Sequence, residues 1–279
     1  MNTRRLSARD MLYEEAGPRA KRRILIITIL SLAALAALAV LVVRQFYITG
    51  QLQGRYWNFY AKATTWRFLG HGLLGTLEAA AASGLMAFGA GYLLMRGRIS
   101  SNRILSTVCS VLVEFTRGVP TLLFIYFFFL VLPQLGVKMD AFWKISIPVA
   151  ISACGVVAEV LRSGVNAVSK GQREAALSLG MRGGSVFRKV IFPQAIRFVI
   201  PALIAELVIV VKDTTFAYVV SFPDLMQNSK VLISNYDALV SIYLVTAVIY
   251  ILINYLLNRL SDTIAARQHR PSVGTVKIV

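Results

Sequence analysis

The stretch Glu174-Ala-Ala-Leu-Ser-Leu-Gly180-Met-Arg-Gly-Gly-Ser-Val-Phe-Arg-Lys-Val-Ile-Phe-Pro193 lies between two long apolar segments. Its first part predicts a short helix. Ser169 is a candidate N-cap, and Gln172 three residues later completes a capping box. The run Arg173 to Leu179 consists of good helix formers, and Gly180 suits the left-handed conformation that ends many helices. A polar helix set between apolar segments offers a surface to a soluble partner.

The second part of the stretch predicts a turn and another short helix. Gly183 and Gly184 are expected to form a flexible turn. The second helix is expected to begin at Ser185 and to end before Pro193, because proline lacks an amide donor and disfavours helix in the residue before it.

Ala175 and Ala176 give the first helix a smooth side that can lie in a groove. The charged residues around that side are Arg173, Glu174, Arg182 and Lys189. The alternative interpretation is an ordinary basic loop held near the membrane by anionic lipid.

Composition favours a protein embedded in the lipid bilayer. Of 279 residues, 57% are hydrophobic, and the mean hydropathy is +0.65. Soluble chains are closer to half apolar. The net charge is +17, but the basic residues cluster beside apolar runs rather than along one soluble face, so membrane topology explains them better than nucleic-acid binding does. We expect no nucleic-acid partner.

Apolar runs predict about six membrane-spanning helices. Ile24–Val43 has twenty residues, enough for the ~30 Å bilayer core at ~1.5 Å per residue. A cleaved signal peptide is the competing interpretation, since Lys21-Arg22-Arg23 precedes this run. However, the run is too long, and Arg44-Gln45-Phe46 offers no small-residue cleavage site. Five further spans are expected at Gly70–Met95, Ile104–Leu132, Phe142–Val165, Ala195–Val220 and Leu239–Leu257.

Small residues recur at helical spacing in the expected span Gly70–Met95 and allow neighbouring helices to approach closely. They are Ala80, Gly84, Ala87 and Gly91.

The distribution of basic residues predicts that both termini are cytoplasmic. With this orientation, the inside segments carry 21 Lys and Arg and the outside loops carry 7. The positive-inside rule therefore places the Glu174–Pro193 stretch in the cytoplasm.

We expect one membrane domain in four parts. A cytoplasmic arm covers residues 1–23, and an extra first transmembrane helix with an outside loop covers 24–69. The main transmembrane domain covers 70–260, with a cytoplasmic loop at about 166–194, and a cytoplasmic tail covers 261–279.

Charged residues in or near the spans need a reason, since each costs about 3 kcal/mol at the bilayer centre. They are Glu78, Glu114, Arg117, Glu159, Glu206, Lys212 and Asp213. They either pair with one another and hold helices together, or line a polar pathway where a helix is broken. Glu114 and Arg117 share a helix face and are expected to form an ion pair, and Pro120 must kink that helix.

Cysteine and histidine offer no site. Cys109 and Cys154 lie in apolar surroundings without metal-ligand spacing, and His71 and His269 are isolated. The sequence therefore predicts no metal site and no catalytic residues.

The opening stretch resembles the E-A-A-x3-G-x9-I-x-L-P loop of ABC importer permeases. It matches at Glu174, Ala175, Ala176, Gly180 and Pro193, and it departs at Val190 and Phe192, where the family usually has Ile and Leu. The resemblance implies an all-α integral membrane protein with the type I ABC importer permease fold. It also implies a cytoplasmic coupling helix that docks on the ATP-hydrolysing subunit. The coupling residues expected from it are Arg173, Glu174, Ala175, Ala176, Gly180, Met181, Arg182 and Pro193.

Two further segments are similar to the polar amino-acid branch of this family. Arg117-Gly-Val-Pro120 resembles its R-G-T-P segment, and Lys212-Asp-Thr-Thr215 resembles its K-D-T-S segment. The arm Leu12–Pro18 looks like that of actinobacterial glutamate-uptake permeases. The substrate-pathway candidates are Arg117, Pro120, Glu159, Lys212, Asp213 and Thr214. Arg117 or Lys212 would meet substrate carboxylates, while acidic residues would meet the ammonium group or pair structurally.

The resemblance implies a transport subunit rather than an enzyme, in a bacterial cell membrane, that imports a polar amino acid, with glutamate preferred. The chain has no G-x-x-x-x-G-K-[ST] phosphate loop, so ATP and Mg²⁺ are expected on a separate ATPase and no cofactor on this chain. The other expected partners are a second permease subunit and an extracytoplasmic amino-acid-binding protein.

An ion-coupled secondary transporter or channel is the alternative, but it predicts inverted repeats, which the sequence does not show. A membrane enzyme would need clustered His, Cys or paired acids near one membrane face.

Overall fold

The computed structural model describes residues 17–268, which divide into two compact units. The first unit, Met1–Trp57, contains the long helix α2 (Pro18–Ile48) and the short η1 (Gly54–Tyr56). Proline in the first turn of α2 costs nothing, because the first amides of a helix have no partner within it. The predicted first span lies within α2, and the expected arm and tail fall partly outside the described residues, at 1–16 and 269–279.

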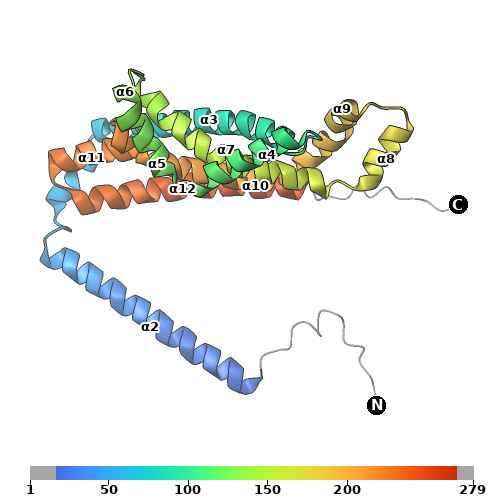
Figure 1. Ribbon diagram of the computed structural model, residues 1–279. Coiled ribbons are helices and arrows are strands. Elements are labelled where there is room, and N and C mark those ends of the chain that lie inside the picture. Colours follow the sequence, from blue (N-terminus) through green and yellow to red (C-terminus); the bar gives the residue numbers. More distant parts are fainter. Residues whose placement is uncertain (1–16, 269–279) are drawn as a thin grey trace, which may run out of the picture. The chain divides into compact units, whose positions relative to one another are not determined.

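The second unit, Asn58–Val279, is helical throughout its described part (Figure 1). Its elements are η2 (Asn58–Ala61), α3 (Ala63–Arg98), α4 (Arg103–Gly118), α5 (Thr121–Tyr126), η3 (Phe127–Val131), α6 (Leu132–Gln134), α7 (Ala141–Ala167), α8 (Lys170–Ser178), α9 (Gly183–Val186), η4 (Phe187–Ile191), α10 (Phe192–Asp213), η5 (Thr214–Val220), α11 (Leu225–Tyr236) and α12 (Leu239–Gln268). Among the described residues, five helices are long and apolar enough to cross a membrane, or six if one bent pair counts as a span.

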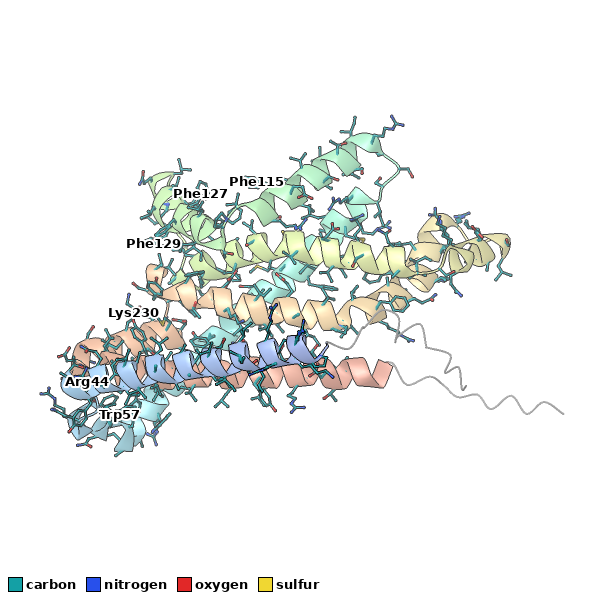
Figure 2. All side chains as sticks on the ribbon, turned by 90° about the horizontal axis from the view of Figure 1, so that it is seen from below. Arg44, Trp57, Phe115, Phe127, Phe129 and Lys230 are labelled. Atoms are coloured by element: carbon teal, nitrogen blue, oxygen red, sulfur yellow. The ribbon has the colours of Figure 1, made fainter. Side chains whose placement is uncertain are left out.

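Helix α7 forms the centre of the second unit. It packs on α3, α4, α5 and α10, and α10 packs in turn on α12 (Figures 1 and 2). In the most apolar stretch of α7, 61% of the residues are buried, whereas in that of α12 only 17% are buried. The outer helices therefore present apolar side chains outward, as a bilayer requires.

Small residues bring the helices together, as the sequence predicted for α3. Ala80, Ala87 and Gly91 are buried, and a Cβ on Gly91 would lie 2.9 Å from the Cys154 carbonyl oxygen of α7. Gly164 of α7 approaches α10 as closely, with a Cβ 2.8 Å from the Ala195 carbonyl oxygen. Glycine is required at such backbone contacts.

Pro120 breaks the predicted third span rather than kinking it. The helix pair Arg103–Gly118 and Thr121–Gln134 is bent by 95°. Val119 is extended, with φ −92° and ψ 126°, because the proline ring disfavours the helical conformation in the preceding residue.

Helix α11 was not expected from the sequence. It lies at the end of the unit opposite α8 and α9 (Figure 1) and packs on α3 and α12. Asp224 caps its amino terminus by accepting a hydrogen bond from the Gln227 amide at 2.7 Å.

Candidate functional site: a polar hairpin and two polar clusters

Helix α8 ends as its glycine predicts. Gly180 has φ +75°, and its amide donates to the Leu177 carbonyl at 2.9 Å. The Met181 amide donates to the Ala176 carbonyl at 3.2 Å, and Met181 packs on the cluster that contains Ala176. These two bonds and the apolar contact form a Schellman motif, which fixes the direction in which the chain leaves α8.

Helix α8, the turn after it, α9 and η4 form a hairpin, residues 170–191. Its two alanines face different ways. Ala176 is buried with Val168, Val186, Ile191 and Ala195 in a small core beneath α8. Ala175 is exposed. The expectation that both alanines form one smooth docking side is therefore wrong: Ala176 holds the hairpin together.

Exposed leucines extend the outer side of α8. Leu177 is 45% exposed and Leu179 is 83% exposed, and Arg173, Glu174 and Arg182 are exposed beside them. These leucines were not among the expected coupling residues, although an apolar residue at either side of Ser178 in a polar helix is a visible signal. Ala175 and Leu179 are four residues apart and lie on one side of the helix, and exposed apolar residues among charges are typical of a protein contact.

Two local expectations, the capping box and the flexible glycine turn, are wrong. Ser169 occupies the N-cap position without a side-chain cap hydrogen bond, and Gln172 accepts instead from Gln194 of α10 at 3.3 Å. No capping box therefore forms. Gly183 and Gly184 are the first turn of α9 rather than a flexible turn.

The second helix also does not end before Pro193. It continues through a wide π-turn, η4, into α10. In this turn the Phe192 amide donates to the Phe187 carbonyl, five residues back, and the Gln194 side chain donates to the Val190 carbonyl at 2.9 Å. The wider turn accommodates proline within a continuous helix.

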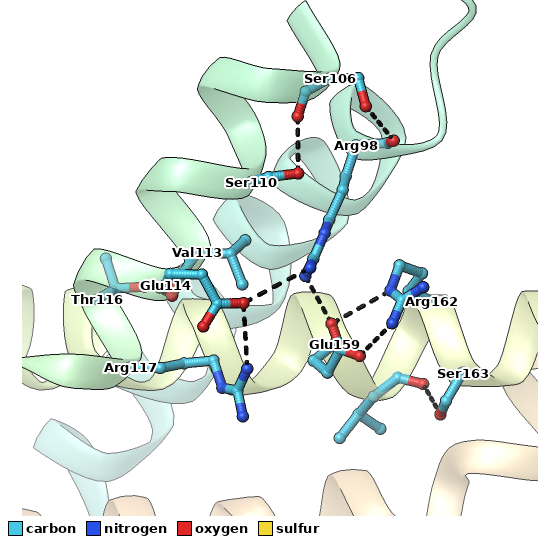
Figure 3. Close-up of polar contacts among 11 residues, drawn as sticks. Arg98, Ser106, Ser110, Val113, Glu114, Thr116, Arg117, Glu159, Arg162 and Ser163 are labelled. Atoms are coloured by element: carbon cyan, nitrogen blue, oxygen red, sulfur yellow. Dashed lines mark hydrogen bonds and ion pairs between the residues drawn. The ribbon is translucent and has the colours of Figure 1, made fainter.

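A cluster of five charges joins α3, α4 and α7 (Figure 3). Glu159 accepts hydrogen bonds from Arg98 at 2.6 Å and from Arg162 at 2.5 Å. Glu114 lies 3.5 Å from both Arg98 and Arg117, so the predicted ion pair of Glu114 with Arg117 is confirmed. Arg98, which was expected in a loop, is the bridge between the two carboxylates. The cluster carries one more cation than anion.

A second, smaller cluster lies at the break after Pro120. The Thr121 hydroxyl donates to Asp213 of α10 at 2.8 Å and lies 2.8 Å from the Ser152 hydroxyl of α7. Thr214 is fully buried and donates to the Val211 carbonyl within its own helix turn. The broken span is therefore tied to α7 and α10 by neutral donors.

The pathway candidates thus fall into two groups and one isolated cation. Arg117 and Glu159 belong to the five-charge cluster, and Pro120 and Asp213 belong to the cluster at the break. Lys212 is exposed and forms no ion pair with any described residue, so no structural pair accounts for it.

Two other charges of the spans also stand apart. Glu206 is 6% exposed and lines an apolar pocket between α3 and α10, without a hydrogen-bond partner among residues 17–268. Glu78 is exposed on α3.

Comparison with known proteins decides what this arrangement is. Residues 85–270 match the family described as "Binding-protein-dependent transport system inner membrane component". The chain belongs to this family. The matched region contains the hairpin and the two polar clusters, whereas α2 precedes it.

Curated relatives of this permease transport amino acids. The glutamate transport system permease protein GluD of Corynebacterium glutamicum is 33% identical over 82% of this chain and 85% of its own length. The probable glutamine ABC transporter permease protein GlnP of Bacillus subtilis is 31% identical over 72% of this chain and 94% of its own length.

Solved structures share the fold. An amino acid ABC transporter crystallised with histidines is 29% identical, with a TM-score of 0.69 over 75% of this chain and 98% of that chain. The inward-facing MetNI methionine ABC transporter is 20% identical and has a TM-score of 0.63, which supports the fold alone. This protein is a multi-pass inner-membrane permease subunit of an ABC amino-acid importer. It is not itself an enzyme, and ATP hydrolysis belongs to a separate subunit.

Proposed function

We propose that this permease carries glutamate into the cell by alternating access, driven by ATP hydrolysis on its partner subunit. The observation that carries the proposal is the 33% identity to the glutamate permease GluD along 82% of the chain. The surplus cation of the five-charge cluster supports it, because a dicarboxylic amino acid needs more cationic than anionic partners.

The hairpin is the proposed contact with the ATPase. Its exposed side combines Leu179 and Ala175 with Arg173, Glu174 and Arg182, and Gly180 and Met181 set its direction. Pro193 lies at the start of α10, directly after the π-turn. Helices α9, η4 and α10 are continuous, and α8 packs on them through Ala176, so a push on α8 would be transmitted to α10 through this contact.

Arg117 and Lys212 are the proposed carboxylate ligands. Arg117 is 40% exposed and holds Glu114 at 3.5 Å, which leaves donors of its guanidinium available. Lys212 is exposed and has no acidic partner among the described residues. Asp213 and Glu159 are the proposed partners of the substrate ammonium group, with Pro120 and Thr214 shaping the break beside them.

In the assembled importer, two permease subunits enclose the pathway, and an extracytoplasmic binding protein delivers the amino acid. The hairpin and both termini face the cytoplasm, in keeping with the bias in basic residues. ATP and Mg²⁺ are bound by the ATPase, and this chain holds no cofactor.

Uptake into proteoliposomes that contain the permease, its ATPase and its binding protein tests the substrate. We expect ATP-driven uptake of labelled glutamate that excess unlabelled glutamine or arginine suppresses only weakly. Arg117→Ala or Lys212→Ala should lower glutamate uptake by about tenfold, the loss of one charged hydrogen bond. Arg103→Ala, which removes an exposed cation at the start of α4 outside the hairpin, is the matched control and should retain uptake. Preferential transport of glutamine or arginine would refute glutamate as the substrate.

A further inference from the structure

The polar end of the second unit contains a pocket beside the beginning of α8. It has a volume of about 500 Å³ and lies between the end of α3, the end of α7 and the beginning of α8. Three cationic side chains line it: Arg96, Lys170 and Arg173. No acidic residue lines it in the described part of the chain, although Glu174 is adjacent in sequence.

The cations of this pocket form no ion pair with any residue in the described part of the chain. Arg98, two residues from Arg96, binds Glu114 and Glu159, but Arg96 has no ion pair within residues 17–268. Its guanidinium instead stacks 4.0 Å from the centre of the Phe187 ring, which also lines the pocket. Stacking fixes the guanidinium plane and leaves its donors for a ligand.

The amino terminus of α8 also favours an anion, and it lies at the same pocket. Ser169 and Lys170, its N-cap and first residue, both line the pocket, and no side chain caps the helix. The first amides of a helix lack partners within it and favour an anion. Ser101 and Asn166 add neutral polar groups to the lining. The chemistry of the pocket matches a phosphate group.

A second pocket continues from the first along the membrane helices. It has a volume of about 580 Å³ and shares Arg96, Ile99 and Ser101 with the basic pocket. Its other lining residues include Leu93 and Leu105, which are 68% and 46% exposed. A cationic pocket joined to an apolar surface at the end of membrane-spanning helices fits a lipid headgroup and the start of its acyl chain.

We propose that this pair of pockets binds an anionic phospholipid, with its phosphate held by Arg96, Lys170 and the amino terminus of α8. The site adjoins α8, so an occupied site fixes the first turn of the hairpin. Lipid binding at this site does not depend on which amino acid the permease carries or on which side of the membrane the hairpin lies.

Native mass spectrometry of the purified full-length chain tests the site. We expect at least fivefold more retained phosphatidylglycerol than phosphatidylcholine. The double variant Arg96→Gln/Lys170→Gln should lose this preference, whereas Arg188→Gln/Lys189→Gln should keep it, because both of those residues are exposed on the same hairpin outside the pocket. Equal phosphatidylglycerol binding by both double variants overturns the proposal. Displacement of the lipid by millimolar inorganic phosphate alone, or by the ATPase subunit, also overturns it by assigning the site to a free anion or to protein.

Hydrogen exchange of the unmodified chain supplies a test that needs no variant. In nanodiscs of phosphatidylglycerol, the amides of residues 169–173 should exchange several-fold more slowly than in nanodiscs of phosphatidylcholine. The amides of α11, at the opposite end of the unit and outside both pockets, are the internal reference and should not change. Equal exchange of residues 169–173 in the two lipids contradicts the proposal.

Discussion

Gly180 is the residue on which the shape of the hairpin depends most. Its φ of +75° is strained for any residue with a Cβ, although the space around it is open. Gly180→Ala should therefore destabilise the end of α8 by about 1 kcal/mol. We expect faster hydrogen exchange in residues 176–182 and weaker co-purification with the ATPase.

Gly183 provides the matched control for this substitution. It lies in the first turn of α9 with a negative φ and open space around it. Gly183→Ala should leave exchange and co-purification unchanged or improve them slightly, because alanine favours helix. If both alanine variants behave alike, the left-handed turn does not determine the docking geometry.

Asp224 should make the free energy of unfolding depend on pH. It is fully buried between η5 and α11, and burial raises the pKa of its carboxyl from 3.8 to about 6. Folding then favours the protonated form, so the free energy of unfolding falls as the pH rises through this interval. Asp224→Asn retains an oxygen that accepts the Gln227 amide and removes the titration.

Unfolding of the full chain in detergent measures this effect. Relative to Asp224→Asn, the wild type should lose on the order of 2 kcal/mol of stability between about pH 4 and pH 7. A wild-type-to-variant difference that is flat with pH, or that grows in the opposite direction, contradicts the assignment of a buried, readily protonated carboxyl.

Single residues were predictable where the cause is local. Gly180 follows from backbone sterics, and the Glu114–Arg117 pair follows from helical spacing. The capping box failed because Gln172 is engaged by Gln194, which is 22 residues away and contacts it only in the folded hairpin. Arg98 was missed for the same reason, since its partners come from two other helices.

At the scale of the helices, the contact of α3 with α7 depends on small residues where the two backbones approach closely. A Cβ on Gly91 would lie 2.7 Å from Val157 Cγ1 and 2.9 Å from the Cys154 carbonyl oxygen, so the helices must separate to accept it. Gly91→Ala should lower the free energy of unfolding by about 1–3 kcal/mol. Gly89, two residues earlier, has open space where a Cβ would lie, with no contacting atom within 4 Å, and Gly89→Ala should be neutral or stabilising.

Thermal unfolding of the two variants in the same detergent distinguishes them. An equal loss in both would show that helix propensity or lipid contact, rather than the α3–α7 approach, decides stability at this position.

The existence of the spans was predictable, but their interruptions were only partly so. Apolar length indicates a membrane helix, and Pro120 indicates a disturbance in one. Whether proline breaks a helix, as at Pro120, or is absorbed by a π-turn, as at Pro193, depends on packing and on side chains such as Gln194 that satisfy freed carbonyls. Helix α11 was missed because it is short, although Asp224 followed three residues later by Gln227 is an amino-terminal capping signal.

At the scale of the whole molecule, a polar hairpin lies at one end of a helical unit, and polar clusters lie within it. The polar stretch of the hairpin and a disturbance of the third span at Pro120 were visible in the sequence, whereas the break itself and the part of Arg98 in the charged cluster were not. The separation of the pathway candidates into two clusters was not visible either, because it depends on how α3, α4, α7 and α10 pack. Isolated Lys212 and partly bonded Arg117 are the cations proposed for the carboxylates of a substrate.

The central claim is that this permease moves an amino acid with energy from ATP, received through the hairpin. Glutamate uptake into proteoliposomes that contain the permease, its ATPase and its binding protein tests this claim most directly, with ATP or a non-hydrolysable analogue inside and ionophores present. We expect uptake that requires hydrolysable ATP, persists when ion gradients are collapsed, and falls severalfold in Gly180→Ala but not in Gly183→Ala. Uptake that follows an imposed ion gradient and proceeds without ATP would contradict the claim.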